Sequence, residues 1–335
     1  MNKKITLLTL AIGAVLGFVL ITSYQENHQE LLAPLGLPPV PFPKDNPYSK
    51  AKAELGKRLY FDKCLSANDQ ISCASCHAVE RAYADPREIS EGVLGRKGTR
   101  HAPTVINSAY NTHQFWDGRV KTLEEQVKGP IANTNEMSLF HDTKISYEEC
   151  QKRVRKDPAY LKMFYDVFGN EDCSVDQIAQ AIATFERTLL SGNSPYDRYK
   201  AGDKTAMTEE QIAGYRVFTH VGCGNCHFEP LFTDGRFLNI GVGMDAEKPD
   251  LGRYNITKDE KDYGAFKVPT LRETAKSYPY MHDGSQATLE EVIDYYDKGG
   301  TPNKNLHTLM RPLHLSAQDK KSLKAFLEAL NGEGF

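Results

Sequence analysis

Two short motifs contain the residues with the clearest chemical meaning. Each has two cysteines separated by two residues and followed directly by a histidine, the attachment signature of a c-type haem. The two thiols bond to the vinyl groups of one porphyrin, and the histidine ligates its iron. A zinc site would need two more Cys or His near each pair, and a thiol redox centre would not need the histidine. The sequence therefore predicts two covalently bound haem c groups, held by Cys73, Cys76 and His77 and by Cys223, Cys226 and His227.

The second axial position of each iron decides what a haem does, because an open position binds peroxide and a filled one favours electron transfer. After the first motif, His101 and His113 are candidate ligands. Gln126 and Glu136 form a polar pair that could meet peroxide, since a carboxylate can move a proton between the peroxide oxygens. A solvated surface acid is the alternative for Glu136. After the second motif, the spacing does not choose among Met244, Met281, Tyr296 and Met310.

The composition sets outer limits on the protein class. A chain of 335 residues suggests two domains of ordinary size, and a net charge of -3 gives no sign of binding to nucleic acid or anionic lipid. Covalent haem attachment belongs to the oxidising side of a bacterial membrane, where disulfides persist. Cys150 and Cys173 are therefore a candidate disulfide and Cys64 the odd cysteine, with three unpaired core residues as the alternative.

The N-terminus indicates export. Lys3 and Lys4 precede an apolar run from Ile5 to Ile21, so residues 1–23 are predicted to be a signal peptide or a retained membrane anchor. Residues 24–47 form a proline-rich linker. Both interpretations place the globular part in the periplasm, with the N-terminal segment as its only membrane contact.

The elements that position the motifs occur twice. Pro103-Thr104, Trp116 and Thr122 have counterparts 166 positions later at Pro269-Thr270, His282 and Thr288. We therefore expect a mainly α fold of two tandem cytochrome c-like haem domains with long loops, over residues 48–203 and 204–335.

Helix signals agree with this duplication. Before each motif a glycine precedes an aromatic residue by four positions, Gly56 with Tyr60 and Gly214 with Phe218, which predicts a helix packed closely on another. Apolar periodicity predicts a helix near the end of each half, starting after Ser174 and after Ser316. The first includes Leu189 and the second ends at Gly332. Ser174 with Gln177 has capping-box spacing, and Ser316 with Asp319 is a looser version of it.

From about Leu35 to its end, the chain resembles the bacterial di-haem cytochrome c peroxidases and their MauG-type relatives. The resemblance is carried by both haem motifs and by Arg100–Thr104, Gln114–Arg119, Leu123–Gln126, Asn135–Met137 and Pro279–Gly284. It implies that the first haem binds peroxide, with His77 as proximal ligand and Gln126 and Glu136 as the distal pair. Trp116 matches the tryptophan that relays electrons between the haems. His227 would be the proximal ligand of the second haem, and His282 would orient its surroundings.

Three positions depart from the usual family pattern. Val93 stands where many members carry a histidine that caps the resting first haem, so that haem should be open without reductive activation. Tyr296 replaces the usual methionine ligand of the second haem and matches the tyrosine ligand of MauG, which implies a low-potential second haem. His101 replaces an asparagine that binds an interhaem calcium, which leaves a calcium site supported by the carbonyls of Ser277 and Pro279 in doubt.

The sequence thus predicts a periplasmic oxidoreductase that reduces hydrogen peroxide with electrons from a small c-type cytochrome or cupredoxin. A MauG-type maturation enzyme, which oxidises side chains of a protein substrate, is the first alternative. A non-catalytic di-haem electron carrier is the second. A homodimer is suggested by analogy with the family alone.

Overall fold

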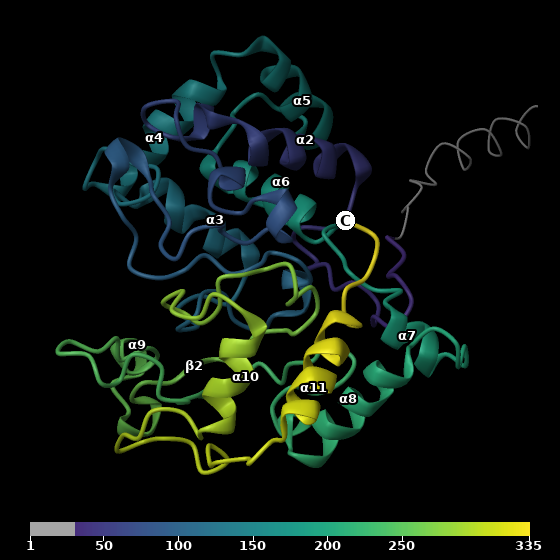
Figure 1. Cartoon of the computed structure of the whole chain (residues 1–335). Coiled ribbons are helices and arrows are strands. Elements are labelled where there is room, and N and C mark those ends of the chain that lie inside the picture. Colours follow the sequence, from purple (N-terminus) through teal and green to yellow (C-terminus); the bar gives the residue numbers. More distant parts are fainter. Residues whose placement is uncertain (1–30) are drawn as a thin grey trace, which may run out of the picture. The chain divides into compact units, whose positions relative to one another are not determined.

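In a computed structural model of the chain, which describes residues 31–335, the fold consists of helices and long loops with one small two-stranded β-sheet (Figure 1). Strands β1 (Phe237–Leu238) and β2 (Phe266–Lys267) pair antiparallel. The helices are α2 (Lys50–Phe61), α3 (Leu123–Ala132), α4 (Thr143–Val154), α5 (Pro158–Phe168), α6 (Val175–Glu186), α7 (Pro195–Lys200), α8 (Glu209–His220), α9 (Tyr254–Thr257), α10 (Leu289–Asp297) and α11 (Ala317–Glu328). The prediction of a mainly α protein is confirmed.

The predicted N-terminal signal or anchor segment lies outside the described residues. Within residues 31–335, no helix is both long and apolar enough to cross a lipid bilayer.

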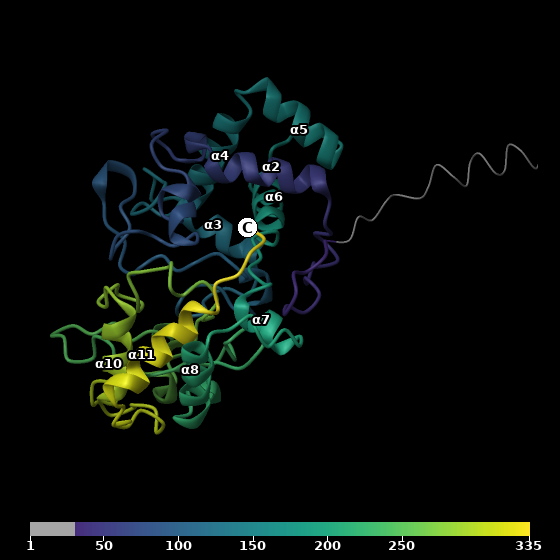
Figure 2. The same cartoon turned by 45° about the vertical axis from the view of Figure 1, so that its right-hand side comes forward.

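The two glycines before the haem motifs each let two helices approach closely. A Cβ on Gly56 of α2 would lie 1.9 Å from the carbonyl oxygen of Ala181 in α6, and one on Gly214 of α8 would lie 1.8 Å from that of Ser322 in α11. Helices α8 and α11 lie side by side in both views (Figures 1 and 2). The predicted close packing is confirmed in both halves.

The predicted helix starts are also confirmed. Ser174 and Ser316 cap α6 and α11, each in a capping box with the residue three positions later. Both helices end earlier than the apolar periodicity suggested. Leu189 is buried in a turn after α6, because packing on the core requires an apolar side chain but not a helical backbone.

The duplication extends to backbone conformation. The paired positions 166 residues apart have the same left-handed φ angles, the same isolated strand bridge and the same helix cap. A left-handed φ is uncommon outside glycine, so its recurrence at Phe115 (63°) and Met281 (73°) marks one loop built twice. The matched features are the bridges Gln114–Val120 and Tyr280–Gln286, the residues Phe115 and Met281, the glycines Gly118 and Gly284, and the caps Thr122 and Thr288.

Two apolar cores contain most of the buried apolar side chains, one spanning residues 55–189 and the other residues 196–330. Residues 31–335 nevertheless form one compact unit, and Tyr196 of α7 packs in the second core, so the predicted domain limits stay a prediction. Cys150 and Cys173 are free thiols in the first core. The predicted disulfide is therefore wrong. Cys64 is also free, but it is only partly buried against this core.

Candidate haem and peroxide sites

Both C-x-x-C-H motifs fold in the same way. The residues from the first cysteine form a short 3-10 turn, Cys73–Ser75 and Cys223–Asn225. The backbone N–H of His77 then donates to the carbonyl of Cys73 at 3.0 Å, and that of His227 to the carbonyl of Cys223 at 3.1 Å. This turn presents two thiols and an imidazole together.

The hydrogen bonds of the two histidines fix which ring nitrogen can ligate a metal. Nδ1 of His77 lies 3.1 Å from the carbonyl oxygens of Tyr83 and Pro103, and Nδ1 of His227 lies 2.9 Å from that of Phe232. Because a carbonyl only accepts, Nδ1 carries the proton and Nε2 keeps its lone pair. Burial lowers the pKa of both imidazoles, which also favours the neutral ligating form. These residues fit a haem in each half.

The first cavity encloses about 50 Å³ beside the first motif. Cys73, Cys76 and His77 line it together with Gln126 of α3 and Glu136 from the loop after α3. The structure thus brings together the residues that the sequence paired. Neither His101 nor His113, the candidate distal ligands, lines this cavity. His101 binds the carbonyl of Arg87 and faces the other cavity, and His113 packs beside Phe237 of β1.

Glu136 is held by its neighbours in a defined position. The side-chain amide of Asn133 donates to Oε1 of Glu136 at 2.6 Å. Burial raises the pKa of Glu136, while Asn133 and the charge of Arg119 oppose that rise. The carboxyl is therefore not the solvated surface acid that was the alternative interpretation. It is a half-buried acid with one oxygen not engaged by Asn133.

Val93, in the short turn Val93–Gly95, lies against the backbone of Glu136. Its side chain is fully buried, and its backbone N–H donates to the carbonyl of Glu136 at 2.8 Å. A side chain on Gly92 would collide with the carbonyls of Asn135 and Glu136. The loop that would carry a capping histidine is thus fixed against the Glu136 segment, and its buried residue has no atom that can ligate iron.

The second cavity is larger, at about 250 Å³, and apolar. Cys223, Cys226, His227, Tyr296, Met281 and Met310 line it, whereas Met244 does not. The two neighbouring tyrosines of α10 differ in their contacts. The hydroxyl of Tyr295 donates to the carbonyl of Ile240 at 3.0 Å, but Tyr296 faces the cavity. Burial and the nearby cysteines raise the pKa of Tyr296. The phenol is thus available to a ligand in this cavity.

Trp116 connects the two halves. Its Nε1 donates to the carbonyl of His101 at 2.9 Å, its own carbonyl accepts from the N–H of Lys267, and its ring lines the second cavity. His282, the counterpart of Trp116, accepts at its carbonyl from the N–H of His101 and stacks on Phe266 at 3.6 Å. Burial lowers the pKa of His282 to about 4, so the ring is neutral near pH 7.

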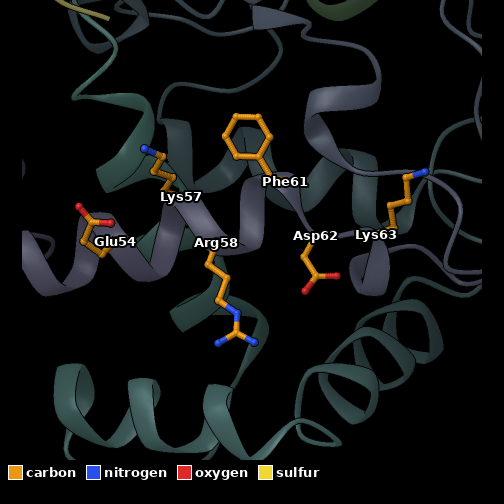
Figure 3. A pocket seen from close by; sticks show the side chains of 6 residues that line it. All are labelled: Glu54, Lys57, Arg58, Phe61, Asp62 and Lys63. Carbon is orange, nitrogen blue, oxygen red and sulfur yellow. The ribbon is translucent and has the colours of Figure 1, made fainter.

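The carbonyl-bearing residues Ser277 and Pro279, predicted for calcium, also line the second cavity. In the part of the chain that the structure describes, no three His, Cys, Asp or Glu side chains gather in a way that could hold a metal ion. A further hollow lies on the outside of α2, among Glu54, Lys57, Arg58, Phe61, Asp62 and Lys63 (Figure 3). It contains none of the residues predicted to do chemistry.

Three residues of these sites were not predicted. Asn133 gave no signal beyond lying three positions before Glu136. Glu186 lines the first cavity with its Oε2 unpartnered among residues 31–335, and burial raises its pKa to about 8. Its position four residues after Ile182, on the apolar face of a predicted helix, was an available signal. Lys267 lines the second cavity. It lies 166 positions after His101, and this repeat offset was the available signal for it.

Comparisons with known proteins agree with this geometry. A family model of the di-haem cytochrome c peroxidases matches residues 50–205. Cytochrome-c peroxidase IdrP1 of Pseudomonas sp. (strain SCT) is 35% identical over 365 aligned positions, covering 98% of this chain and 93% of the relative. Methylamine utilization protein MauG of Methylorubrum extorquens is 37% identical over 300 positions, covering 88% of this chain and 82% of the relative.

Among solved structures, a MauG-like protein associated with microbial copper homeostasis superposes with a TM-score of 0.82 at 34% identity, covering 90% of this chain and 95% of its own. The chain belongs to the di-haem cytochrome c peroxidase family. It is an oxidoreductase of that peroxidase class, and two haem groups are the cofactors that this family implies.

Proposed function

We propose that the protein is a periplasmic di-haem c oxidoreductase of the MauG-like subtype, which reduces hydrogen peroxide at the first cavity. The observation that carries this proposal is the half-buried Glu136 beside Gln126 in the cavity lined by His77. A haem iron with an open axial position supplies peroxide binding and one-electron redox chemistry. The protein's own residues would bind and protonate the substrate.

Glu136 would act as the acid–base residue. Reduction of one peroxide to two waters needs two protons and two electrons, and the proton on the near oxygen must first reach the far one. The Glu136 oxygen not held by Asn133 can accept that proton and return it, while the Gln126 amide can donate a hydrogen bond to peroxide. The nearby charge of Arg119 would favour the ionised form of Glu136.

Trp116 would relay electrons between the two halves. Its ring lines the second cavity, and its Nε1 and carbonyl hydrogen bonds hold the indole in one orientation. His227 and Tyr296 would be the two iron ligands of the second haem, with His282 as a neutral, stacked residue beside it. Electrons from outside would enter through this second half.

Tyr296 also supports the MauG-like subtype and a second candidate function. A phenolate ligand stabilises oxidised iron, which suits an enzyme that stores two oxidising equivalents for use on a protein side chain. The partner is then either a small electron donor, a c-type cytochrome or cupredoxin, or a specific protein substrate. Export through residues 1–23, an interhaem calcium held by the carbonyls of Ser277 and Pro279, and a homodimer are further parts of this proposal.

One stopped-flow experiment separates these functions. The fully oxidised protein is mixed with peroxide in the absence of reductant, and the haem absorbance is followed. We expect a fast change that yields a long-lived spectrum. No reaction until one electron is supplied would contradict an open first haem and favour a reductively activated peroxidase. No reaction with either redox state would favour a non-catalytic electron carrier.

A further inference from the structure

Lys267 places an ammonium group beside the second cavity, where no carboxylate of the described residues neutralises its charge. It is the last residue of β2 and lines the cavity. Its Nζ donates to the carbonyl of His113 at 3.0 Å, and no carboxylate of residues 31–335 forms an ion pair with it. Burial lowers the pKa of Lys267 to about 8, with no nearby charge acting against that shift. An ammonium in this position has unused donors and lacks a counter-ion.

The cavity itself contains no other formal charge. Within the described part of the chain, its lining includes no Asp or Glu and, apart from Lys267, no Lys or Arg. A haem carries two propionate carboxylates, and a carboxylate that leaves water without a cation or hydrogen-bond donors is strongly destabilised. The unpaired ammonium and the anionic edge of the cofactor are therefore complementary.

We propose that the Lys267 ammonium binds a propionate carboxylate of the haem in the second cavity, and so ties that haem to the loop that carries Trp116. The inference rests on the proposed function, because it requires a haem in this cavity. The backbone N–H of Lys267 donates to the carbonyl of Trp116 at 2.8 Å, and its side chain reaches His113 in the same loop. Lys267 would thus contact both the haem propionate and the loop that carries Trp116.

The duplicated position supports a role specific to the second half. The counterpart of Lys267, 166 positions earlier, is His101, whose Nδ1 binds the carbonyl of Arg87. Burial lowers the pKa of His101, so its ring is neutral near pH 7. The two copies of this position therefore contribute one neutral ring and one cation.

The test is the reduction potential of the second haem in Lys267→Met, measured by spectroelectrochemistry on the full chain with both haems attached. Tyr296→Phe identifies which spectral component belongs to that haem. Removing a cation that binds a propionate should favour ferric iron by about tenfold, which is about 59 mV for a one-electron couple. Lys267→Arg should keep the wild-type potential. Lys248→Met removes the same charge from an exposed loop position and should change nothing. The propionate bending band in resonance Raman spectra should shift in Lys267→Met alone.

Haem content distinguishes the ways in which the idea can fail. A wild-type protein with fewer than two haems per chain would refute the proposed function itself. Two haems with an unchanged potential and an unchanged propionate band in Lys267→Met would overturn the propionate contact. If Lys267→Met loses the second haem, Lys267→Arg decides: a retained haem with the wild-type potential supports the contact, and loss of the haem there too overturns it.

Discussion

At the scale of single residues, the first cavity depends on the carboxyl of Glu136, which is half-buried and held at one oxygen by Asn133. Glu136→Gln keeps the size of the side chain and removes its ability to accept a proton. We expect the reaction with peroxide to slow by about 10²- to 10⁴-fold, the usual contribution of general acid–base catalysis. Stopped-flow rates measure this directly. Glu148→Gln, at an exposed position of α4, is the matched control and should react like the wild type.

The pH dependence gives a second test of Glu136. Burial raises its pKa above the ordinary value of 4.5 despite Asn133 and Arg119. The ionised form accepts the proton, so the rate should fall as the pH drops through this raised pKa, and the limb should lie above pH 4.5. Glu136→Gln should lack the limb. The same limb in both proteins would mean that another group, with Glu186 as the first candidate, controls the reaction.

The adjacent tyrosines of α10 offer a matched pair of substitutions. Tyr296→Met replaces a phenol that faces the second cavity with a thioether, which stabilises ferrous iron, so the second haem should become easier to reduce. Tyr295→Phe removes a hydroxyl bound to the carbonyl of Ile240. It should cost about 1 kcal/mol of stability and leave the haem spectrum unchanged. Spectroelectrochemistry and urea unfolding separate the two effects; equal spectra for Tyr296→Met and the wild type would exclude Tyr296 as a ligand.

At the scale of the elements, the two close helix crossings should make glycine essential. Alanine is normally the better helix former by about 1 kcal/mol. At Gly56 and Gly214 the added methyl group would collide with a backbone carbonyl of the facing helix, so Gly56→Ala and Gly214→Ala should destabilise the protein by about 1–3 kcal/mol. Gly98→Ala has no atom nearer than 3.8 Å to the new methyl group and should be neutral. Urea unfolding decides, and a stabilised Gly56→Ala would contradict the close packing.

Sequence patterns predicted those elements because each signal was local. Capping at Ser174 and close packing at Gly56 depend on a few residues within one or two turns. The orientation of side chains across the two halves depends on the fold as a whole. His101 lies near the first motif in sequence, yet the loop carrying Trp116 turns it to the second cavity. The same limit applies to Cys150 and Cys173, because burial in one core does not bring two sulfur atoms into bonding geometry.

At the scale of the whole molecule, buried polar contacts join segments that are far apart in sequence. Arg272 pairs with Asp197 of α7 through two hydrogen bonds of 2.8 Å and also donates to the carbonyl of Pro230. Ser191 donates to the buried Glu273 at 2.6 Å. These contacts hold the segment between the two haem motifs against the second half. Relative placement of the cavities, and hence any electron transfer between them, depends on this segment.

Substitution of Asp197 tests how much the Arg272–Asp197 ion pair contributes to stability. Side chains of Arg272 and Asp197 are 0% and 3% exposed, so Asp197→Ala would leave a buried, unpaired guanidinium and should cost about 3–5 kcal/mol at neutral pH. Asp166→Ala breaks a pair in which both side chains are at least half exposed and should cost less than about 1 kcal/mol.

At acidic pH, the difference in the free energy of unfolding between Asp197→Ala and the wild type should disappear. Burial alone would raise the pKa of Asp197, but Arg272 and Ser194 hold it below the ordinary 3.8. A lowered pKa in the folded state gives stability that is complete above the unfolded value and is lost as the pH falls through the folded one. Urea unfolding of the haem-loaded proteins should therefore show a gap that is widest near neutral pH and shrinks below the usual aspartate range. A gap independent of pH would mean that the lost packing of Asp197, and not its charge, couples α7 to the second half.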